Sequence, residues 1–258
     1  MTFRLASIGI MASGAMCLLA SPVFAWEWSQ PVGNVGLEAA YDDHISGRAT
    51  VDQNLYPLGN ADWRSVMGLG VNEDLAFDPT WGMDFGARFQ SNRFVSYPEF
   101  DSYQGAATVE FNGYALPGDL DLYADYVYSS DFTFSQTQSL SLCLARPLFL
   151  HLVATGTAGY FRYDSTLPGL PDQGPFGDLE LDYHFPFDMT LSLGSSYMER
   201  TFQGGRLDSL LGFYLTASQR FMQNAYLNGT YSYENIDSTD PASSFPDNSF
   251  SLGTSYFF

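Results

Sequence analysis

Apolar and polar residues alternate with a period of two through most of this chain, and this feature limits the possible folds more than any other. At the end of the chain, Phe250, Leu252, Thr254, Tyr256 and Phe258 fall on one face, and mostly serine and glycine fall on the other. In a strand, this alternation sends the two sets to opposite sides of a sheet. Soluble sandwiches and transmembrane barrels both use such strands, so the ending alone leaves both folds open.

Similar alternating segments of about ten residues recur along the chain, which is the length that a tilted membrane-crossing strand needs. We identify twelve of them, although ten or fourteen strands would also fit the pattern. The segment 149–163 is ambiguous because both of its faces are mixed. The predicted spans are 33–44, 63–76, 81–92, 103–115, 119–129, 138–146, 149–163, 176–185, 188–199, 206–220, 223–234 and 248–258.

The connections between these segments alternate in length. Every second one is tight, as in "FDPTW", "ALPGD" and "HFPFDM", whereas the intervening ones tend to be longer, as in "NIDSTDPASSFPDN". An up-and-down barrel with both termini in the periplasm has short periplasmic turns and longer outer loops. A Greek-key sandwich has no reason to sort its loops in this way, so the connections favour a transmembrane antiparallel barrel of about twelve strands.

The first 25 residues have the features of a secretory signal peptide. Arg4 precedes an apolar stretch from about Ile8 to Leu19, and small residues lead to a predicted cleavage site after about Ala25. The apolar stretch is shorter than the ~20 residues of a retained membrane-spanning helix. The sequence therefore predicts a signal peptide at 1–25 and one barrel domain at 26–258.

The residues after this segment exclude several other classes of protein. They include one cysteine, Cys143, so no internal disulfide can form, and no apolar run approaches 18 residues. They contain nine arginines and no lysine against 29 acidic residues. Such a negative chain is unsuited to binding nucleic acid phosphates.

The ending "FSLGTSYFF" resembles the assembly signal of Gram-negative outer-membrane β-barrel proteins. The matching residues are Phe250, Leu252, Tyr256 and the terminal Phe258. The resemblance implies location in the outer membrane, contact with its lipid and lipopolysaccharide, and insertion by the barrel-assembly machinery. The stretch "AAYDDHISG" is also similar to an element of barrels linked to exopolysaccharide export, but His44 stands where asparagine is usual there.

Charged residues mostly lie opposite the apolar face, which predicts that they line the interior of the barrel. Carboxylates facing lipid would cost several kcal/mol each, so they must point inward. Aromatic residues among them could guide sugars or nucleosides, but packing inside the barrel is the commoner role of such residues. The candidate interior and selectivity residues are Glu38, Asp84, Arg88, Glu110, Asp121, Tyr123, Asp125, Asp178, Glu180, Asp182, Arg220 and Glu234.

Two readings of this interior remain open. Rings of carboxylates attract cations, and about twelve strands leave room for a narrow pore at most, which favours a cation-preferring channel for small cationic or neutral solutes. Alternatively, acids and arginines fill a closed barrel with a structural role, for example in a secretion or exopolysaccharide-export assembly.

An enzyme is the third hypothesis and has the least support. His44 lies near Asp42, Asp43 and Ser46, but such sets are common in polar loops. The serine–histidine motif of outer-membrane phospholipases and the acid–histidine pattern of omptin proteases are both missing. We therefore expect no catalytic residues, and the sequence indicates no metal and no cofactor.

Overall fold

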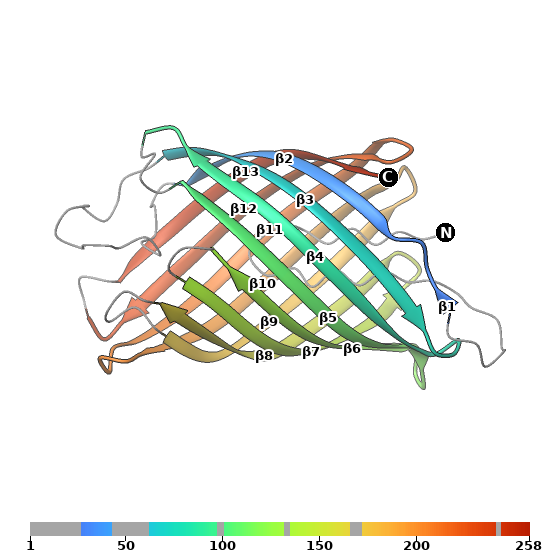
Figure 1. The fold of residues 1–258 in the computed structure, drawn as a ribbon, viewed down its shortest axis with the longest axis horizontal. Helices are drawn as coiled ribbons and strands as arrows, with labels where there is room; N and C mark the ends of the chain where they lie inside the picture. The colour runs from blue at the N-terminus through green and yellow to red at the C-terminus, as the bar shows by residue number, and fades with distance from the viewer. Residues whose placement is uncertain (1–26, 43–61, 97–100, 132–134, 166–171, 241–243) are drawn as a thin grey trace.

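In the computed structural model, every regular element among the described residues is an antiparallel strand (Figure 1). It describes residues 27–42, 62–96, 101–131, 135–165, 172–240 and 244–258. The part of the chain that it describes contains no helix long and apolar enough to cross a membrane. The strands are β1 (Glu27–Trp28), β2 (Val32–Asp42), β3 (Asp62–Ala76), β4 (Trp81–Phe94), β5 (Ser102–Leu116), β6 (Leu120–Ser130), β7 (Ser135–Phe149), β8 (Leu152–Ser165), β9 (Asp172–Phe185), β10 (Met189–Phe202), β11 (Leu207–Met222), β12 (Ala225–Ser238) and β13 (Phe245–Phe257).

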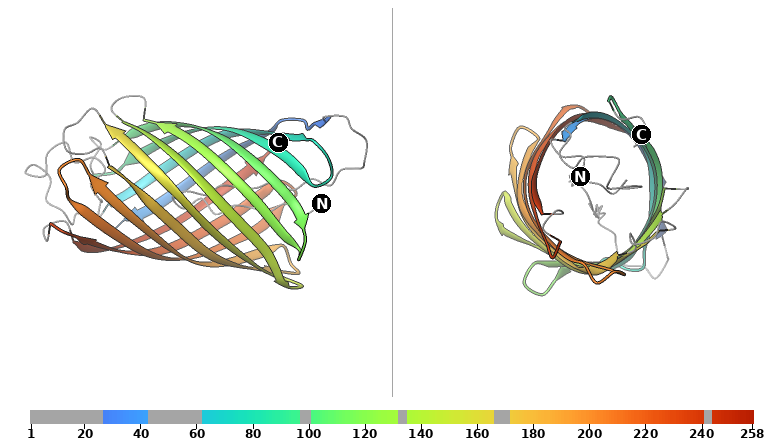
Figure 2. Two further views of the ribbon diagram at one scale, coloured as in Figure 1. Left: turned by 90° about the horizontal axis from the view of Figure 1, so that it is seen from below. Right: turned by 90° about the vertical axis from the view of Figure 1, so that its left-hand side faces the viewer.

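Strands β2 to β13 close into a single ring, which Figure 2 shows from one end. Each strand pairs with its neighbour in sequence, and β13 pairs with β2 from Ser249↔Asp42 to Phe257↔Asn34. The short strand β1 pairs with β3 beyond the end of β2. The twelve-stranded up-and-down barrel predicted from the sequence is therefore confirmed, and an open sandwich is excluded.

The two ends of the barrel differ in their connections. The end that carries 77–80, 117–119, 150–151, 186–188 and 223–224 is called the turn end, and the last strand also finishes there. The opposite end is called the loop end, and its connections include the long segment 43–61. Two loop-end connections, 131–134 and 203–206, are as short as the turn 77–80. The alternation of lengths is thus a tendency rather than a strict rule.

The outer wall of the barrel exposes the large apolar side chains that a soluble protein would bury. Leu140 is 62% exposed, Leu179 68% and Leu193 58%. Aromatic rings lie outward near both ends of this wall, with Tyr41 and Trp63 in contact at the loop end at 5.2 Å between ring centroids. An apolar band flanked by aromatic residues is the surface that hydrocarbon and headgroups require.

Strand β8 resolves the ambiguous segment of the sequence. Tyr160 is 49% exposed on its outer face, whereas Phe161 is 4% exposed and lies on the inner face. Even-numbered residues of β8 therefore point outward. The faces looked mixed because small residues such as Ala154, Gly156 and Ala158 occupy the outer one.

Candidate interior site

All twelve candidate interior residues lie on strands at positions that alternate with the exposed apolar residues, so their side chains point into the barrel. For example, Asp125 lies between the outward residues Ala124 and Tyr126, and Glu110 lies between Val109 and Phe111. Their grouping on the inner wall depends on the pairing of neighbouring strands.

Four carboxyl groups form a row across adjacent strands, which we call the acid ladder: Asp74, Asp84, Glu110 and Asp125. Asp74 of β3 pairs in register with Asp84 of β4, which pairs with Glu110 of β5, which pairs with Asp125 of β6. The Glu110 carboxyl lies within hydrogen-bonding reach of both neighbouring acids. The Ser141 hydroxyl of β7 donates to Asp125 Oδ2 at 3.3 Å and ends the row.

The ladder is deeply buried on its β5 and β6 side. Asp125 is 0% exposed, Glu110 is 3% exposed and the adjacent Asn112 is 1% exposed. Asn112 Nδ2 donates to Asp84 Oδ2 at 2.9 Å, but no amide, hydroxyl or guanidinium donor among the described residues bonds to Asn112 Oδ1, Glu110 Oε1 or Asp125 Oδ1. Two unit charges 4 Å apart repel by about 4 kcal/mol at an effective dielectric constant of about 20, so the ladder favours either a proton shared between neighbouring carboxyl groups or a positive charge beside it.

A second set of carboxylates, which we call the acid column, follows one strand: Asp178, Glu180 and Asp182 of β9. The Tyr214 hydroxyl of β11 lies 3.1 Å from Asp178 Oδ1 and 2.9 Å from Glu180 Oε2, and it can donate to either. The Ser192 hydroxyl of β10 donates to Asp182. These hydroxyls orient the carboxyl groups of the column.

Gly194 explains how Tyr214 reaches across a whole strand. A Cβ atom on Gly194 of β10 would lie 2.0 Å from Tyr214 Cζ. The missing side chain therefore leaves the space in which the tyrosine ring lies flat against the inner wall, between β11 and β9.

Arginine and acid meet at a third place on the inner wall. Glu38 of β2 is attracted by Arg64 of β3 and Arg88 of β4. Arg88 Nη2 also donates to Gln90 Oε1 at 3.0 Å. This mixed group is separate in register from the acid ladder, since Arg88 pairs with Gly70 and Ala106.

The other candidate interior residues are scattered. Asp121 Oδ1 accepts a bond from the Ala115 N–H at 2.9 Å, close to the turn end. Tyr123 is 3% exposed and packs edge-to-face against Tyr114. Arg220 lies at the turn end, 3.8 Å from Asp188. Glu234 of β12 faces Asp247 of β13 in register.

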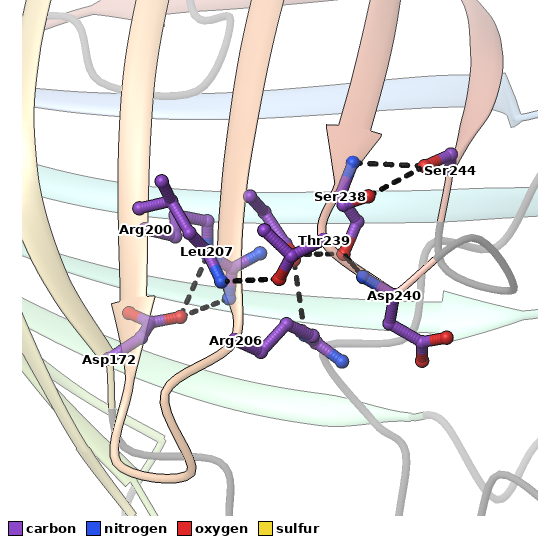
Figure 3. A network of polar contacts seen from close by, with 9 residues as sticks. Asp172, Arg200, Arg206, Leu207, Ser238, Thr239, Asp240 and Ser244 are labelled. Carbon is purple, nitrogen blue, oxygen red and sulfur yellow. Dashed lines mark hydrogen bonds and ion pairs between the residues drawn. The ribbon is translucent and has the colours of Figure 1, made fainter.

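A polar network links the loop ends of strands β9 to β12 (Figure 3). Arg200 contacts Asp172, and Arg206 lies 3.1 Å from Asp208. Both guanidinium groups stack on Phe202, with Arg200 at 5.0 Å and Arg206 at 3.8 Å from the ring centroid. The Leu207 N–H at the start of β11 donates to Oγ1 of Thr239, the residue that follows β12, at 3.0 Å. This network ties neighbouring hairpins together at the rim.

Most of the residues weighed for a catalytic role lie outside the described part of the chain. His184 lies 3.0 Å from the Thr190 hydroxyl at the turn end. His44, Asp43 and Ser46 lie outside the described residues, as does the predicted signal peptide 1–25. Within the described residues, no group of three or more histidine, cysteine, aspartate or glutamate side chains is arranged to hold a metal ion.

Sequence reasoning missed two contributors to the inner wall. Asp74 was not among the candidates, although its parity matches that of Gly70 and Asn72 on the inward face of β3. Asn112 was missed because an amide among inward residues carries no special signal. The position of Asp74 in β3 could have been found from alternation alone, but its contact with Asp84 depends on the register between strands.

The comparisons with solved structures identify the fold class. The COG4313 outer membrane channel from Pseudomonas putida F1 superposes with a TM-score of 0.64 at 12% identity, over 93% of this chain and 97% of that chain. A NanC porin structure gives a TM-score of 0.50 at 12% identity, over 85% and 98%. OmpT of Vibrio cholerae gives 0.48 at 11% identity, over 93% and 100%. The chain thus has the fold of Gram-negative outer-membrane β-barrels.

No family model matches the chain, and no curated protein matches it in sequence.

Proposed function

We propose that the chain is an outer-membrane channel that prefers cations and conducts small solutes. The observation that carries this proposal is the acid ladder, in which four inward carboxyl groups stand in register on four adjacent strands. Fixed negative charge on a low-dielectric wall attracts cations and repels anions. The acid column adds negative charge on β9. The solved structures of similar fold are named a channel and a porin, which agrees with this proposal.

A planar-bilayer recording of the folded barrel under a salt gradient tests this function. We expect steady conductance and a reversal potential of the sign that cation preference produces. The triple variant Asp84→Asn/Glu110→Gln/Asp125→Asn should move the reversal potential most of the way toward zero. A second triple variant, Asp178→Asn/Glu180→Gln/Asp182→Asn, measures the contribution of the acid column.

The control for both variants is Glu199→Gln, which removes a carboxylate from the outer face of β10 near the loop end, where Tyr197 donates to it at 2.7 Å. This change should leave the reversal potential unaltered, because the group does not face the interior. If the two triple variants behave like Glu199→Gln, the ladder and the column do not set selectivity.

A closed barrel with a structural or interaction role is the second candidate function, and the burial of the inner wall favours it. Glu110, Asn112 and Asp125 are at most 3% exposed, which fits an interior packed with side chains. A silent bilayer from verified folded barrel would support this candidate. Stable partners should then co-purify with it, and a secretion or polysaccharide-export assembly is the kind of complex to search for.

A further inference from the structure

The outer wall carries a groove of about 790 Å³ that crosses six strands, from β12 through β13, β2, β3 and β4 to β5. It follows two neighbouring register rows on the lipid-facing side. One row runs Leu227, Thr254, Leu37, Met67, Ser91 and Tyr103, each residue paired with the next. The other runs Leu252, Ala39, Ser65 and Arg93.

Small side chains replace large ones in part of the groove. Ala39 and Ser65 are register partners on the outer face of β2 and β3, and neither fills the space between the taller leucine and methionine side chains. Glu38 of β2, whose side chain points inward, also borders the groove. The floor is therefore formed by strand backbone.

The groove climbs the wall from one end of the barrel toward the other. Leu227 is the third residue of β12, close to the turn end, whereas Tyr103 is the second residue of β5, at the loop end. Strands of a barrel tilt against its axis, so a register row rises obliquely along the wall. A chain molecule lying in the groove would run from the loop-end rim into the apolar band.

A partly exposed arginine, held in an ion pair, lies at the loop end of the groove. Arg93 Nη1 lies 2.8 Å from Asp101 Oδ2, and the Arg93 guanidinium stacks over the Tyr103 ring at 4.9 Å. Its side chain is still 53% exposed. Phe89 stacks against the same Tyr103 ring at 6.1 Å between centroids and forms the adjacent wall.

We propose that this groove binds a phosphorylated lipid of the outer leaflet, with an acyl chain between the two rows and a phosphate on Arg93. The apolar lining continues the lipid-facing wall, and an arginine at a membrane rim is the side chain best suited to a phosphate. The chain has 29 acidic residues and no lysine, so a phosphate at the rim can be held only by an exposed arginine. The proposal requires membrane insertion with the loop end outward, but no particular conductance.

Native mass spectrometry of the folded barrel in detergent tests the phosphate contact. The probes are diphosphoryl lipid A and the same glycolipid without phosphates. We expect the wild-type protein to bind the phosphorylated form about tenfold more tightly, which corresponds to a single charge-assisted contact. Arg93→Gln should abolish this preference. Arg162→Gln, which removes another exposed loop-end arginine beside Asp164, should keep it.

Filling the groove tests the acyl-chain contact. Ala39→Leu should lower affinity for both probes, because the added side chain occupies the floor, whereas Ala158→Leu on the outer face of β8 should have no effect. The proposal is overturned if Arg93→Gln and Arg162→Gln bind the probes alike, or if Ala39→Leu binds like Ala158→Leu. It is also overturned if a dimer forms and Ala39→Leu abolishes it, since the groove would then be an interface between two copies.

Discussion

At the scale of single residues, the inner wall depends on places where a side chain is missing. Tyr214 lies flat across β10 only because Gly194 has no Cβ, and it thereby reaches two carboxylates of β9. Phe176 uses Gly159 in the same way, since a Cβ on Gly159 would lie 2.4 Å from the ring. These glycines are required for space, because the described residues with a positive φ angle lie elsewhere.

We therefore expect Gly194→Ala to destabilise the barrel by about 1–3 kcal/mol, the usual range for overpacking. The ring of Tyr214 would have to leave its site and release Asp178 and Glu180. Urea unfolding of the barrel in liposomes, followed by mobility on unboiled gels, measures the change.

Two comparisons isolate the cause of this effect. Gly36→Ala is the matched control, since its new Cβ would meet its nearest atom, the Thr254 carbonyl oxygen, at an ordinary 3.6 Å. In a Tyr214→Leu background, Gly194→Ala should cost much less, because neighbouring changes that share a contact are not additive. Equal costs in both backgrounds would show that the tyrosine ring is not the obstacle.

At the scale of strands, β13 both closes the barrel and carries the residues that resemble an assembly signal. The Phe258 N–H donates to the Gly33 carbonyl at 2.9 Å, and the Gly33 N–H donates to the Phe258 carbonyl at 2.9 Å. The Phe258 ring covers Gly33 on the outer face and stacks on Tyr256 at 6.4 Å. All four signal residues, Phe250, Leu252, Tyr256 and Phe258, are exposed on the outer wall.

We expect Phe258→Ala to lower the amount of folded barrel in cells several-fold while leaving refolding of the purified chain into liposomes nearly unchanged. The backbone pair with Gly33 survives the substitution, so the closure of the barrel is preserved. Phe221→Ala is the control, because this residue is 52% exposed near the turn end but lies outside the last strand. Gel mobility of membrane fractions measures both. Equal losses in the two variants would mean that the ending carries no special assembly information.

Strand positions could largely be predicted from alternation, but strand ends could not. The segment 81–92 corresponds to Trp81–Phe94, whereas 138–146 corresponds to the longer Ser135–Phe149 and 176–185 to Asp172–Phe185. Hydrophobic alternation stops where the wall leaves the membrane, while backbone pairing continues beyond it. Strand β1 was missed because two residues show no period.

The inward direction of the candidate residues followed from alternation within each strand, but their grouping did not. Glu110 and Asp125 are far apart in chain order from Asp84 and Asp74, and only the register of β3 to β6 aligns them. Register depends on pairing between strands, and the pattern of one strand does not contain it. The acid ladder therefore became visible only in the structure.

At the scale of the whole molecule, charge is distributed unevenly between the two faces and around the inner wall. The outer wall is apolar, whereas the inner wall has acids on β3 to β6 and on β9. Inward arginines lie apart from these groups, with Arg64 and Arg88 beside Glu38 and Arg200 at the loop end. The described acids of the inner wall are thus grouped apart from these arginines rather than mixed with them in a uniform salt-bridged filling.

This layout predicts a particular dependence of selectivity on salt. The screening length falls from about 10 Å at 0.1 M to about 3 Å at 1 M ionic strength. If the field of the acid ladder and column acts across the interior, a fixed tenfold salt gradient should give a smaller reversal potential when both solutions are concentrated. The triple variant of the ladder should show a flatter dependence, because less fixed charge remains to be screened. If preference for cations persists unchanged in concentrated salt, ions instead bind in direct contact with the carboxylates. The ladder variant would then lose selectivity equally at every salt concentration.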